Sequence, residues 1–460
     1  MFLPIVFAIY WLLRNHLKLQ NAFVVLASYV FYGWWDWRFL ILIAFTSFCS
    51  WGSGLLIGKE LKNEGFNELK KKGWLTANIV LNLGILAVFK YYDFFVSEFG
   101  ELFGVSTESL LLRVILPVGI SFYTFQALSY SIDVYRGKIK PTKDIIAFFA
   151  FISFFPQLVA GPIERATNLL PQFLQKRTFS YEQGMDGMRQ ILWGLFKKIV
   201  VADNCAVYVN QVWETYDTQS GGTLLLAAIL FTFQIYGDFS GYSDIAIGTA
   251  KLFGIRLMRN FNNPYFSRDI AEFWRRWHIS LTSWFRDYVY IPLGGNRRGL
   301  LRTIFNTFVV FLICGLWHGA NWTYLVWGLY NVLLFLPLIL LGKSKRYKDA
   351  PLVWKQLPQM LLTFVLVTIG WIIFRAPSMA EAWGYVCAMC SASFFSQPAT
   401  IQYPVWCAMA AIILMLSLEW HYRDAESVPL PKSIWAYYPL IIAIWWFAYR
   451  NTQEFIYFQF

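Results

Sequence analysis

The chain contains apolar runs that are too long for most water-soluble folds to bury. About 20 apolar residues cross a bilayer as a helix, and runs near or above this length occupy residues 74–95, 110–132, 223–247, 321–341 and 358–374. Charged residues make up only 14% of the 460, against roughly 25% in soluble domains. The 22 Trp and 26 Tyr suit the aromatic belts at membrane surfaces. We therefore predict an all-α, polytopic integral membrane helical bundle that forms a single domain over residues 1–460.

The N-terminus and the cysteines suggest no processing and no covalent framework. Residues 1–13 are apolar but lack a basic start and a small-residue cleavage site, so we expect a short first helix that is retained. The six cysteines are scattered along apolar segments, and only Cys387 and Cys390 form a C-x-x-C pair. Helix packing is the favoured role for all six, although Cys314 lies four residues before His318 and could share a helix face with it. We expect no metal site.

The placement of charge predicts an orientation. The formal net charge is +12, and basic residues cluster in residues 59–72, 136–143 and 343–355, which the positive-inside rule assigns to the cytoplasm. The loops 97–109 and 211–222 carry acidic residues and almost no basic ones, so we expect them on the outer side.

One stretch does not fit a simple count of crossings. Residue 143 is assigned to the cytoplasm and residue 211 to the outer side, so the chain between them can cross the membrane only once. This part of the chain nevertheless contains two apolar segments, 145–163 and 191–209. Pro156, Gly161 and Pro162 break the first of them, so we predict that it enters the membrane and returns. Irregular backbone is tolerated at that depth only where protein or a cavity surrounds it.

Residues 251–302 form the longest predicted cytoplasmic stretch, with ten basic and three acidic residues. Its aromatic and apolar positions recur at helical spacing, which predicts an amphipathic helix at the cytoplasmic interface, around residues 265–285. Such a helix could simply anchor the protein to membrane lipid. It could also bind an anionic, ring-bearing ligand, because arginine pairs with phosphate and a base stacks on tryptophan. The candidate binding residues are Trp274, Arg275, Arg276, Trp277 and Arg286.

His318, Asp238 and Asp244 are ionisable residues in apolar stretches that we expect the membrane to bury. An ionisable side chain at bilayer depth usually faces a cavity and has a function there, and histidine changes charge near neutral pH. His318 is therefore a candidate for proton transfer, with a neutral core histidine as the alternative. Asp238 and Asp244 lie in the run 223–247. For both residues we give equal weight to structural hydrogen bonding and to lining a reaction cavity.

Several motifs in the same order are similar to one family. They are PVGISFYTFQ at 117–126, GPIER at 161–165, RRWH at 275–278, IPLGGNR at 291–297, LWHG at 316–319 and FIYFQF at 455–460. Together they resemble the membrane-bound O-acyltransferase (MBOAT) family, and most closely its bacterial alginate O-acetyltransferase membrane-subunit branch. The resemblance covers nearly the whole chain.

The resemblance implies an architecture and a site. It implies about 11–13 membrane helices, with re-entrant and interfacial helices, around a central tunnel. It places the catalytic histidine at His318, on a helical pair at 303–341, and a second recurring polar position at His278. Trp317 and Asn321, close to His318, are added as tentative binding residues. The implied donor is acetyl-CoA, with no separate cofactor.

The implied function is transfer of acetyl from the cytoplasm for O-acetylation of an extracytoplasmic polysaccharide such as alginate. The implied location is the bacterial inner membrane, and the implied partner is an extracytoplasmic hydrolase-like acetyltransferase, with no role for nucleic acid. A peptidoglycan O-acetylation subunit and D-alanyl transfer to teichoic acid are the enzymatic alternatives. A polytopic transporter and a scaffold subunit are the alternatives outside enzymes, although no internal repeat of the transporter kind is evident.

The orientation can be tested by labelling single cysteines on a cysteine-free background. We expect residues introduced in 59–72, 251–302 and 343–355 to be protected from an impermeant thiol reagent applied outside, because the positive-inside rule keeps them in the cytoplasm. Cysteines in 97–109 and 211–222 should react. Outer-face labelling of a cysteine at position 297 would reverse the assigned orientation.

Overall fold

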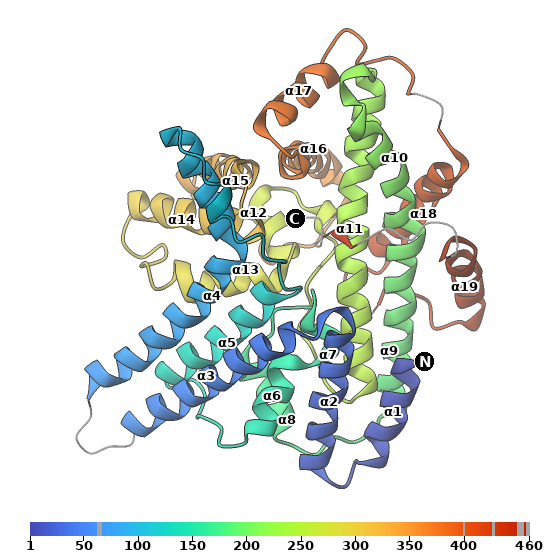
Figure 1. Ribbon diagram of the computed structural model, residues 1–460. Helices are drawn as coiled ribbons and strands as arrows, with labels where there is room; N and C mark the ends of the chain where they lie inside the picture. The colour runs from blue at the N-terminus through green and yellow to red at the C-terminus, as the bar shows by residue number, and fades with distance from the viewer. Residues whose placement is uncertain (62–66, 399–400, 426–427, 449–454, 457–460) are drawn as a thin grey trace. The chain divides into compact units, whose positions relative to one another are not determined.

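The computed structural model describes residues 1–61, 67–398, 401–425, 428–448 and 455–456, and over these residues it contains helices and no strands (Figure 1). Residues 62–66 of the predicted basic loop and 457–460 of the closing FIYFQF segment lie outside the described residues. The predicted all-α class is confirmed. The chain divides into two compact units: unit 1 comprises Met1–Met188 and Ala246–Met258, and unit 2 comprises Arg189–Ile245 and Arg259–Phe460.

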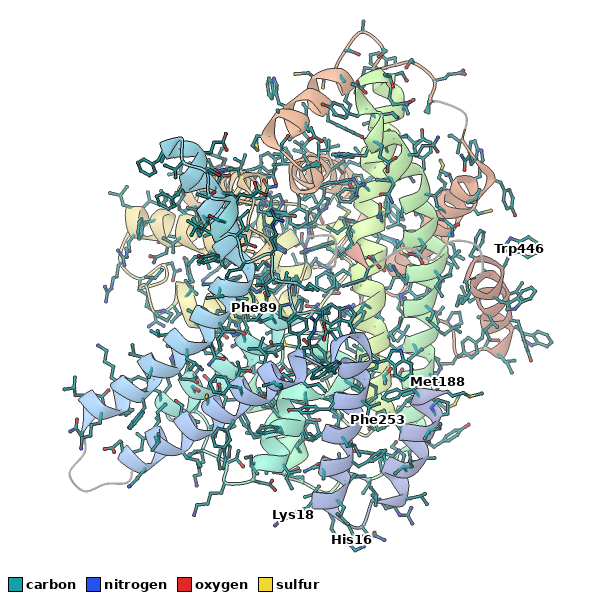
Figure 2. All side chains as sticks on the ribbon, in the orientation of Figure 1. His16, Lys18, Phe89, Met188, Phe253 and Trp446 are labelled. Carbon is teal, nitrogen blue, oxygen red and sulfur yellow. The ribbon has the colours of Figure 1, made fainter. Side chains whose placement is uncertain are left out.

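Unit 1 is built mainly from eight helices near the N-terminus. They are α1 (Phe2–Leu12), α2 (Leu17–Asp36), α3 (Phe39–Glu60), α4 (Glu68–Phe103), α5 (Ile120–Tyr135), α6 (Ile145–Ser153), α7 (Phe155–Leu158) and α8 (Ala166–Phe173). α3, α4 and α5 pack against one another (Figure 1). Figure 2 shows His16 and Lys18 where α1 turns into α2, and both side chains are exposed to some degree.

The predicted break in the segment 145–163 is confirmed. Its two helices, α6 and α7, are separated at Phe154, just before Pro156. A helix of nine residues rises only about 14 Å, which is half of the roughly 30 Å hydrocarbon layer, so α6 alone cannot cross a bilayer. Phe148, Phe151 and Phe154 are fully buried inside unit 1. The segment is therefore surrounded by protein, as irregular backbone at membrane depth requires.

The apolar run 110–132 does not form one helix, which corrects the expectation of a spanning run there. α5 begins only at Ile120, because Pro117 and Gly119 (φ 74°) interrupt the backbone. A side chain at position 119 would place its Cβ 2.5 Å from the carbonyl oxygen of Leu158. The preceding extended segment is tied to α4 instead, where the Asp93 carboxylate accepts the backbone N–H groups of residues 112 and 113, each at 2.8 Å.

Two long helices contribute residues to both units, and the remaining helices belong to unit 2. The shared helices are α9 (Tyr181–Leu195) and α11 (Gly221–Leu252). Besides the short 3₁₀ helices η3 (Tyr216–Thr218), η4 (Pro264–Phe266) and η6 (Trp354–Gln356), those of unit 2 are the π-helix η2 (Phe196–Ala202), α10 (Asp203–Glu214), α12 (Ile270–Arg276), α13 (Ile279–Phe285), the π-helix η5 (Arg286–Tyr290), α14 (Leu300–His318), α15 (Trp322–Leu340), α16 (Leu357–Arg375), α17 (Met379–Met389), α18 (Tyr403–His421) and α19 (Ile434–Ala448).

Seven helices among the described residues are long and apolar enough to cross a membrane. They are α3, α4, α11, α14, α15, the stretch Trp354–Arg375 that contains α16, and α18. The resemblance implies about 11–13 membrane helices, and length and apolarity alone do not select shorter or more polar elements such as the helical run from α9 through α10. The chain is a multi-pass membrane protein.

The prediction of one amphipathic helix across residues 265–285 is wrong. The structure has two seven-residue helices, α12 and α13, separated at Trp277 and His278, and His278 adopts a left-handed φ of 44°. The neighbouring segment replaces the missing helical hydrogen bonds: Ile279 N–H donates to the Asn260 carbonyl at 2.8 Å, and Asn262 N–H donates to Arg276 at 2.9 Å. The aromatic face is buried in protein rather than laid on lipid.

Two glycines allow α14 and α15 to pack with their backbones close together. A Cβ at Gly315 would lie 2.3 Å from the carbonyl oxygen of Tyr324, and a Cβ at Gly328 would lie 2.5 Å from that of Phe311. Small residues at a helix interface permit this approach in membrane proteins, where packing replaces the hydrophobic effect as the force that joins helices. The pair lies in the region 303–341 that was predicted to carry the catalytic histidine.

Substitution of Gly328 by Ala should destabilise the protein, because the new methyl group meets backbone and not a flexible side chain. Gly84 of α4 is the matched control, since nothing lies within 4 Å of a Cβ built there. There Ala should be neutral or stabilising by up to about 1 kcal/mol, the helix-propensity difference. Thermal unfolding of both variants in detergent measures this. Equal melting temperatures would show that α14 and α15 are not in tight contact.

Candidate active site

The side chain of His318 lies at the C-terminal end of α14, enclosed by aromatic rings. It is 8% exposed. Its ring centroid is 4.9 Å from that of Trp317, 5.3 Å from Trp327 and 5.0 Å from Phe374, each in an edge-to-face arrangement. Trp327 comes from α15 and Phe374 from α16, so three helices of unit 2 form the surroundings of the histidine. The protein lining expected for an ionisable group at membrane depth is present.

His278 is buried at the break between α12 and α13 and is tied to a polar cluster. Its Nδ1 lies 3.1 Å from Asn260 Oδ1, which also accepts the hydroxyl of Ser280 at 2.8 Å. Since an amide oxygen only accepts, Nδ1 is the nitrogen that carries the hydrogen in the neutral ring. Burial lowers the pKa of His278 to about 3. The ring is therefore neutral throughout the physiological pH range.

Trp317 connects the two histidines, which are 40 positions apart in the sequence. Its ring centroid is 5.9 Å from that of His278 and 4.9 Å from that of His318. The other two histidines, His16 and His421, are exposed at helix ends. The structure thus brings together the two histidines that the sequence singled out, with Trp317 between them.

A cavity of about 1060 Å³ opens in unit 2 beside this site. Its cationic lining residues are Arg286, Arg297, Arg298 and Lys345, and no carboxylate side chain is among its lining residues. The turn between η5 and α14 forms one wall, where Gly294 (φ 108°) and Gly295 (φ 55°) adopt conformations that favour glycine. Asn306 of α14 holds this turn by donating to the Gly295 carbonyl at 2.8 Å.

The cavity also has apolar lining residues, although His318 itself is not among the residues that line it. Phe311 and Cys314 of α14 line it, together with Trp274 of α12. Cys314 precedes His318 by one helical turn, so both side chains lie on the same face of α14. Trp274 donates its indole N–H to Asn331 at 3.1 Å and contacts Trp327, which in turn contacts His318. The cavity thus combines a cationic part with an apolar part close to the histidine.

The predicted binding residues of α12 and η5 divide into two groups. Trp274 and Arg286 line the cavity. Arg276 instead donates to the Glu272 carboxylate at 3.0 and 3.1 Å, Arg275 donates to the Ser344 carbonyl at 2.8 Å, and Trp277 packs against Phe273 and Trp371. None of these three is among the cavity-lining residues.

Asp238 and Asp244 of α11 are held by two lysines that the sequence reasoning did not select. Lys198 Nζ lies 2.7 Å from Asp238 and 2.9 Å from Asp203, and Lys197 Nζ lies 2.5 Å from Asp244. Both lysines belong to the π-helix η2. Their position inside the apolar run 191–209 was the available signal, because ionisable residues at that depth require partners.

Asn321 has a structural contact on each side of its amide. Its oxygen accepts the N–H of Thr323 at 2.9 Å and so caps α15, while its nitrogen donates to the Pro377 carbonyl at 2.8 Å. The described residues contain no group of three or more His, Cys, Asp or Glu side chains that could hold a metal ion. The cavity cations missed from the sequence are Arg297, Arg298 and Lys345, whereas Cys314 was noted only as able to share a helix face with His318. The missed partner of His278 is Asn260.

Comparison with known proteins places the chain in a family. Residues 137–376 match the model of MBOAT, the membrane-bound O-acyltransferase family. The probable alginate O-acetylase of Pseudomonas aeruginosa is 41% identical over 394 residues, which cover 85% of this chain and 73% of that protein.

Two further relatives carry related names. The peptidoglycan O-acetyltransferase of Helicobacter pylori is 35% identical over 83% of this chain and 76% of that protein. The teichoic acid D-alanyltransferase of Bacillus subtilis is 29% identical over 56% of this chain and 68% of that protein. The family match includes α14, α15 and both buried histidines. The chain therefore belongs to the membrane-bound O-acyltransferase family and is an acyltransferase.

Proposed function

We propose that this protein is an O-acetyltransferase of the bacterial inner membrane that takes acetyl from acetyl-CoA on the cytoplasmic side. It passes the acetyl group across the membrane for O-acetylation of an extracytoplasmic polysaccharide such as alginate, through a separate hydrolase-like acetyltransferase. The observation that supports acetyl-CoA as the donor is the cavity of unit 2. Four cationic side chains and no carboxylate line this cavity, and its lining includes Cys314, which lies one helical turn before His318. Phosphate pairs with such cations, and the thioester suits the apolar end.

The similarity to the Pseudomonas aeruginosa protein supports an acetyl group and a polysaccharide acceptor. The name of the Helicobacter pylori relative supports peptidoglycan as an alternative acceptor. The name of the Bacillus subtilis relative supports D-alanine as an alternative transferred group, although that relative matches less of the chain. A polymer outside the cell and a charged donor inside require that only the acyl group crosses. The need for a partner follows because an impermeable donor and a bulky polymer cannot meet at one buried histidine.

The chemistry assigns His318 the role of general base. The imidazole takes the proton of an acceptor hydroxyl while that oxygen attacks the thioester carbonyl carbon. The carbon–sulfur bond then breaks, and the imidazolium returns the proton to the departing sulfur, which leaves coenzyme A as a thiol. General-base catalysis of this kind contributes roughly 10²–10⁴-fold to the rate. His278 is the second candidate, and its neutral, hydrogen-bonded ring suits orienting a substrate better than exchanging protons.

Replacement of His318 by Gln should reduce polymer acetylation by at least about 100-fold, because the general base is lost. Yield and membrane insertion should be unchanged. Polymer-bound acetate from cells that carry the variant measures this, with immunoblotting of membranes for yield. His421→Gln, which changes an exposed histidine at the end of α18, is the matched control. Near-normal acetylation by a well-expressed His318→Gln protein would remove His318 from the mechanism.

Charge reversal at Arg286 should raise the KM for acetyl-CoA, because this side chain lines the cationic part of the cavity. Its side chain is 62% exposed and already pairs with Asp287 at 2.8 Å, so the effect should be several-fold at most, about 1 kcal/mol or less, and raised salt should mimic it. Steady-state kinetics on purified protein at two salt concentrations measures this.

Arg276→Glu is the matched control for that experiment. This arginine bonds Glu272 inside the fold and does not line the cavity, so its reversal should lower the yield of protein. The KM of the protein that does fold should remain near normal. An unchanged KM in Arg286→Glu would place the donor phosphates elsewhere.

A further inference from the structure

We propose that Arg268 and Arg275 are positioning residues for the acyl donor. They hold the loop 342–352 against α12, and this loop presents Lys345 to the phosphates of the donor. The inference rests on the proposed function, since it identifies a part of the cavity that receives the charged portion of acetyl-CoA. It assigns Arg275 an indirect role, in place of the direct contact expected from the sequence.

The loop begins with a sharp turn at the end of α15. Gly342 adopts a left-handed φ of 65°, which favours glycine. The N–H of Gly342 donates to the Ile339 carbonyl at 3.1 Å, and that of Lys343 donates to the Leu338 carbonyl at 2.8 Å. These bonds end the helix in the manner of a Schellman motif. The turn places Gly342, Ser344 and Lys345 among the residues that line the cavity.

Arg268 holds the far end of the loop with every donor that it has. Its Nε and Nη2 each donate a hydrogen bond to the Glu272 carboxylate, at 2.9 and 2.8 Å. The remaining three bonds go to the carbonyls of Ala350 and Pro351, at 2.9 and 2.8 Å, and to Gln356 Oε1 at 2.8 Å. A guanidinium has five N–H donors and an ammonium has three. Lysine could not make this set of contacts.

The surroundings of Arg268 make these contacts strong. Its side chain is fully buried, and its guanidinium lies 4.2 Å from the ring centroid of Tyr347, a buried residue in the middle of the loop. Burial alone would raise the pKa of Glu272. Hydrogen bonds from Arg268 and the charge of Arg276 outweigh this effect, so the pKa lies below that of an ordinary glutamate. Glu272 is therefore ionised at neutral pH and keeps Arg268 in place.

Arg275 holds the near end of the loop at the cavity wall. Its Nη1 donates to the carbonyl oxygen of Ser344 at 2.8 Å. Ser344 lines the cavity and is directly followed by Lys345, whose side chain is exposed there. The anchor point is therefore one residue from the cation. Arg275 does not itself line the cavity, so it acts on the donor through the loop.

The benefit of such anchoring is that Lys345 is in place before the donor arrives. Ordering a loop at the moment of binding costs affinity, and a loop that is already ordered avoids that cost. Lys345 adds to Arg297, Arg298 and Arg286, of which Arg286 already pairs with the neighbouring Asp287 carboxylate at 2.8 Å. Removal of Arg275 should release Ser344 and thereby cancel most of the contribution of Lys345.

The test compares two ligands on the purified full-length protein in nanodiscs. Equilibrium binding is measured for acetyl-CoA and for S-acetylpantetheine, which has the same thioester but no phosphate. The variants are Arg275→Gln, Lys345→Gln, the double variant, and Arg275→Lys. Lys348→Gln is the matched control, because Lys348 is an exposed cation of the same loop that does not line the cavity.

We expect Arg275→Gln and Lys345→Gln each to weaken acetyl-CoA binding by about 3–10-fold, the range of partly exposed charge-assisted contacts. The double variant should bind acetyl-CoA about as tightly as the weaker-binding of the two single variants, because the two residues act in one chain of contacts. S-acetylpantetheine affinity should not change in any variant, and Lys348→Gln should bind both ligands normally. Arg275→Lys, which keeps the charge but loses the planar donor, should also weaken acetyl-CoA.

Three results would overturn the inference. They are additive losses in the double variant, equal weakening of both ligands by Arg275→Gln, and normal acetyl-CoA binding by Arg275→Gln. If Arg275→Gln does not fold, Arg275→Lys decides in its place, and wild-type affinity of that variant counts against the inference. Failure of the donor assignment itself looks different, because Arg286→Glu and Lys345→Gln would then both leave acetyl-CoA binding unchanged.

Discussion

The geometry of the site depends on the contact between the backbones of α14 and α15. At Gly315 and Gly328 there is no room for a side chain between the two helices, so their axes lie as close as packing allows. This approach brings Trp327 of α15 to the ring of His318 on α14. It also brings Asn331, one turn further along α15, to the indole of Trp274 on the cavity wall. A wider separation would move both contacts together.

A second constraint is that charges within the membrane segments must be satisfied inside the protein. Unit 2 does this with compact groups: Lys198 bridges Asp203 and Asp238, and Lys197 pairs with Asp244. Both lysines belong to a π-helix, a wider turn that is found mainly at specialised sites. Neither aspartate lines the cavity. The sequence left two roles open for Asp238 and Asp244, and these ion pairs favour structural bonding over lining a reaction cavity.

The sequence predicted the elements better than it predicted their contacts. Apolar length was enough for α4, α11, α15 and α16, because a spanning helix follows from composition alone. It failed at 110–132 and at 265–285, where Gly119 and His278 adopt left-handed conformations that no hydrophobic pattern reveals. The pairing of Arg275 with a carbonyl 69 residues away was equally hidden. Arginine next to tryptophan indicated an anion site, but only the fold separates the arginines that line the cavity from those that hold its wall.

The same distinction applies to the histidines and narrows the choice of base. His16 and His421 are exposed at helix ends, which leaves His278 and His318 as the buried candidates. Burial lowers the pKa of His278 to about 3, and its Nδ1 is engaged by Asn260. A base with so low a pKa has little driving force to take a proton from a hydroxyl at neutral pH. His278 is therefore suited to a fixed, neutral role beside Trp317. The proposed base, His318, belongs to α14, the helix whose Cys314 lines the cavity one turn earlier.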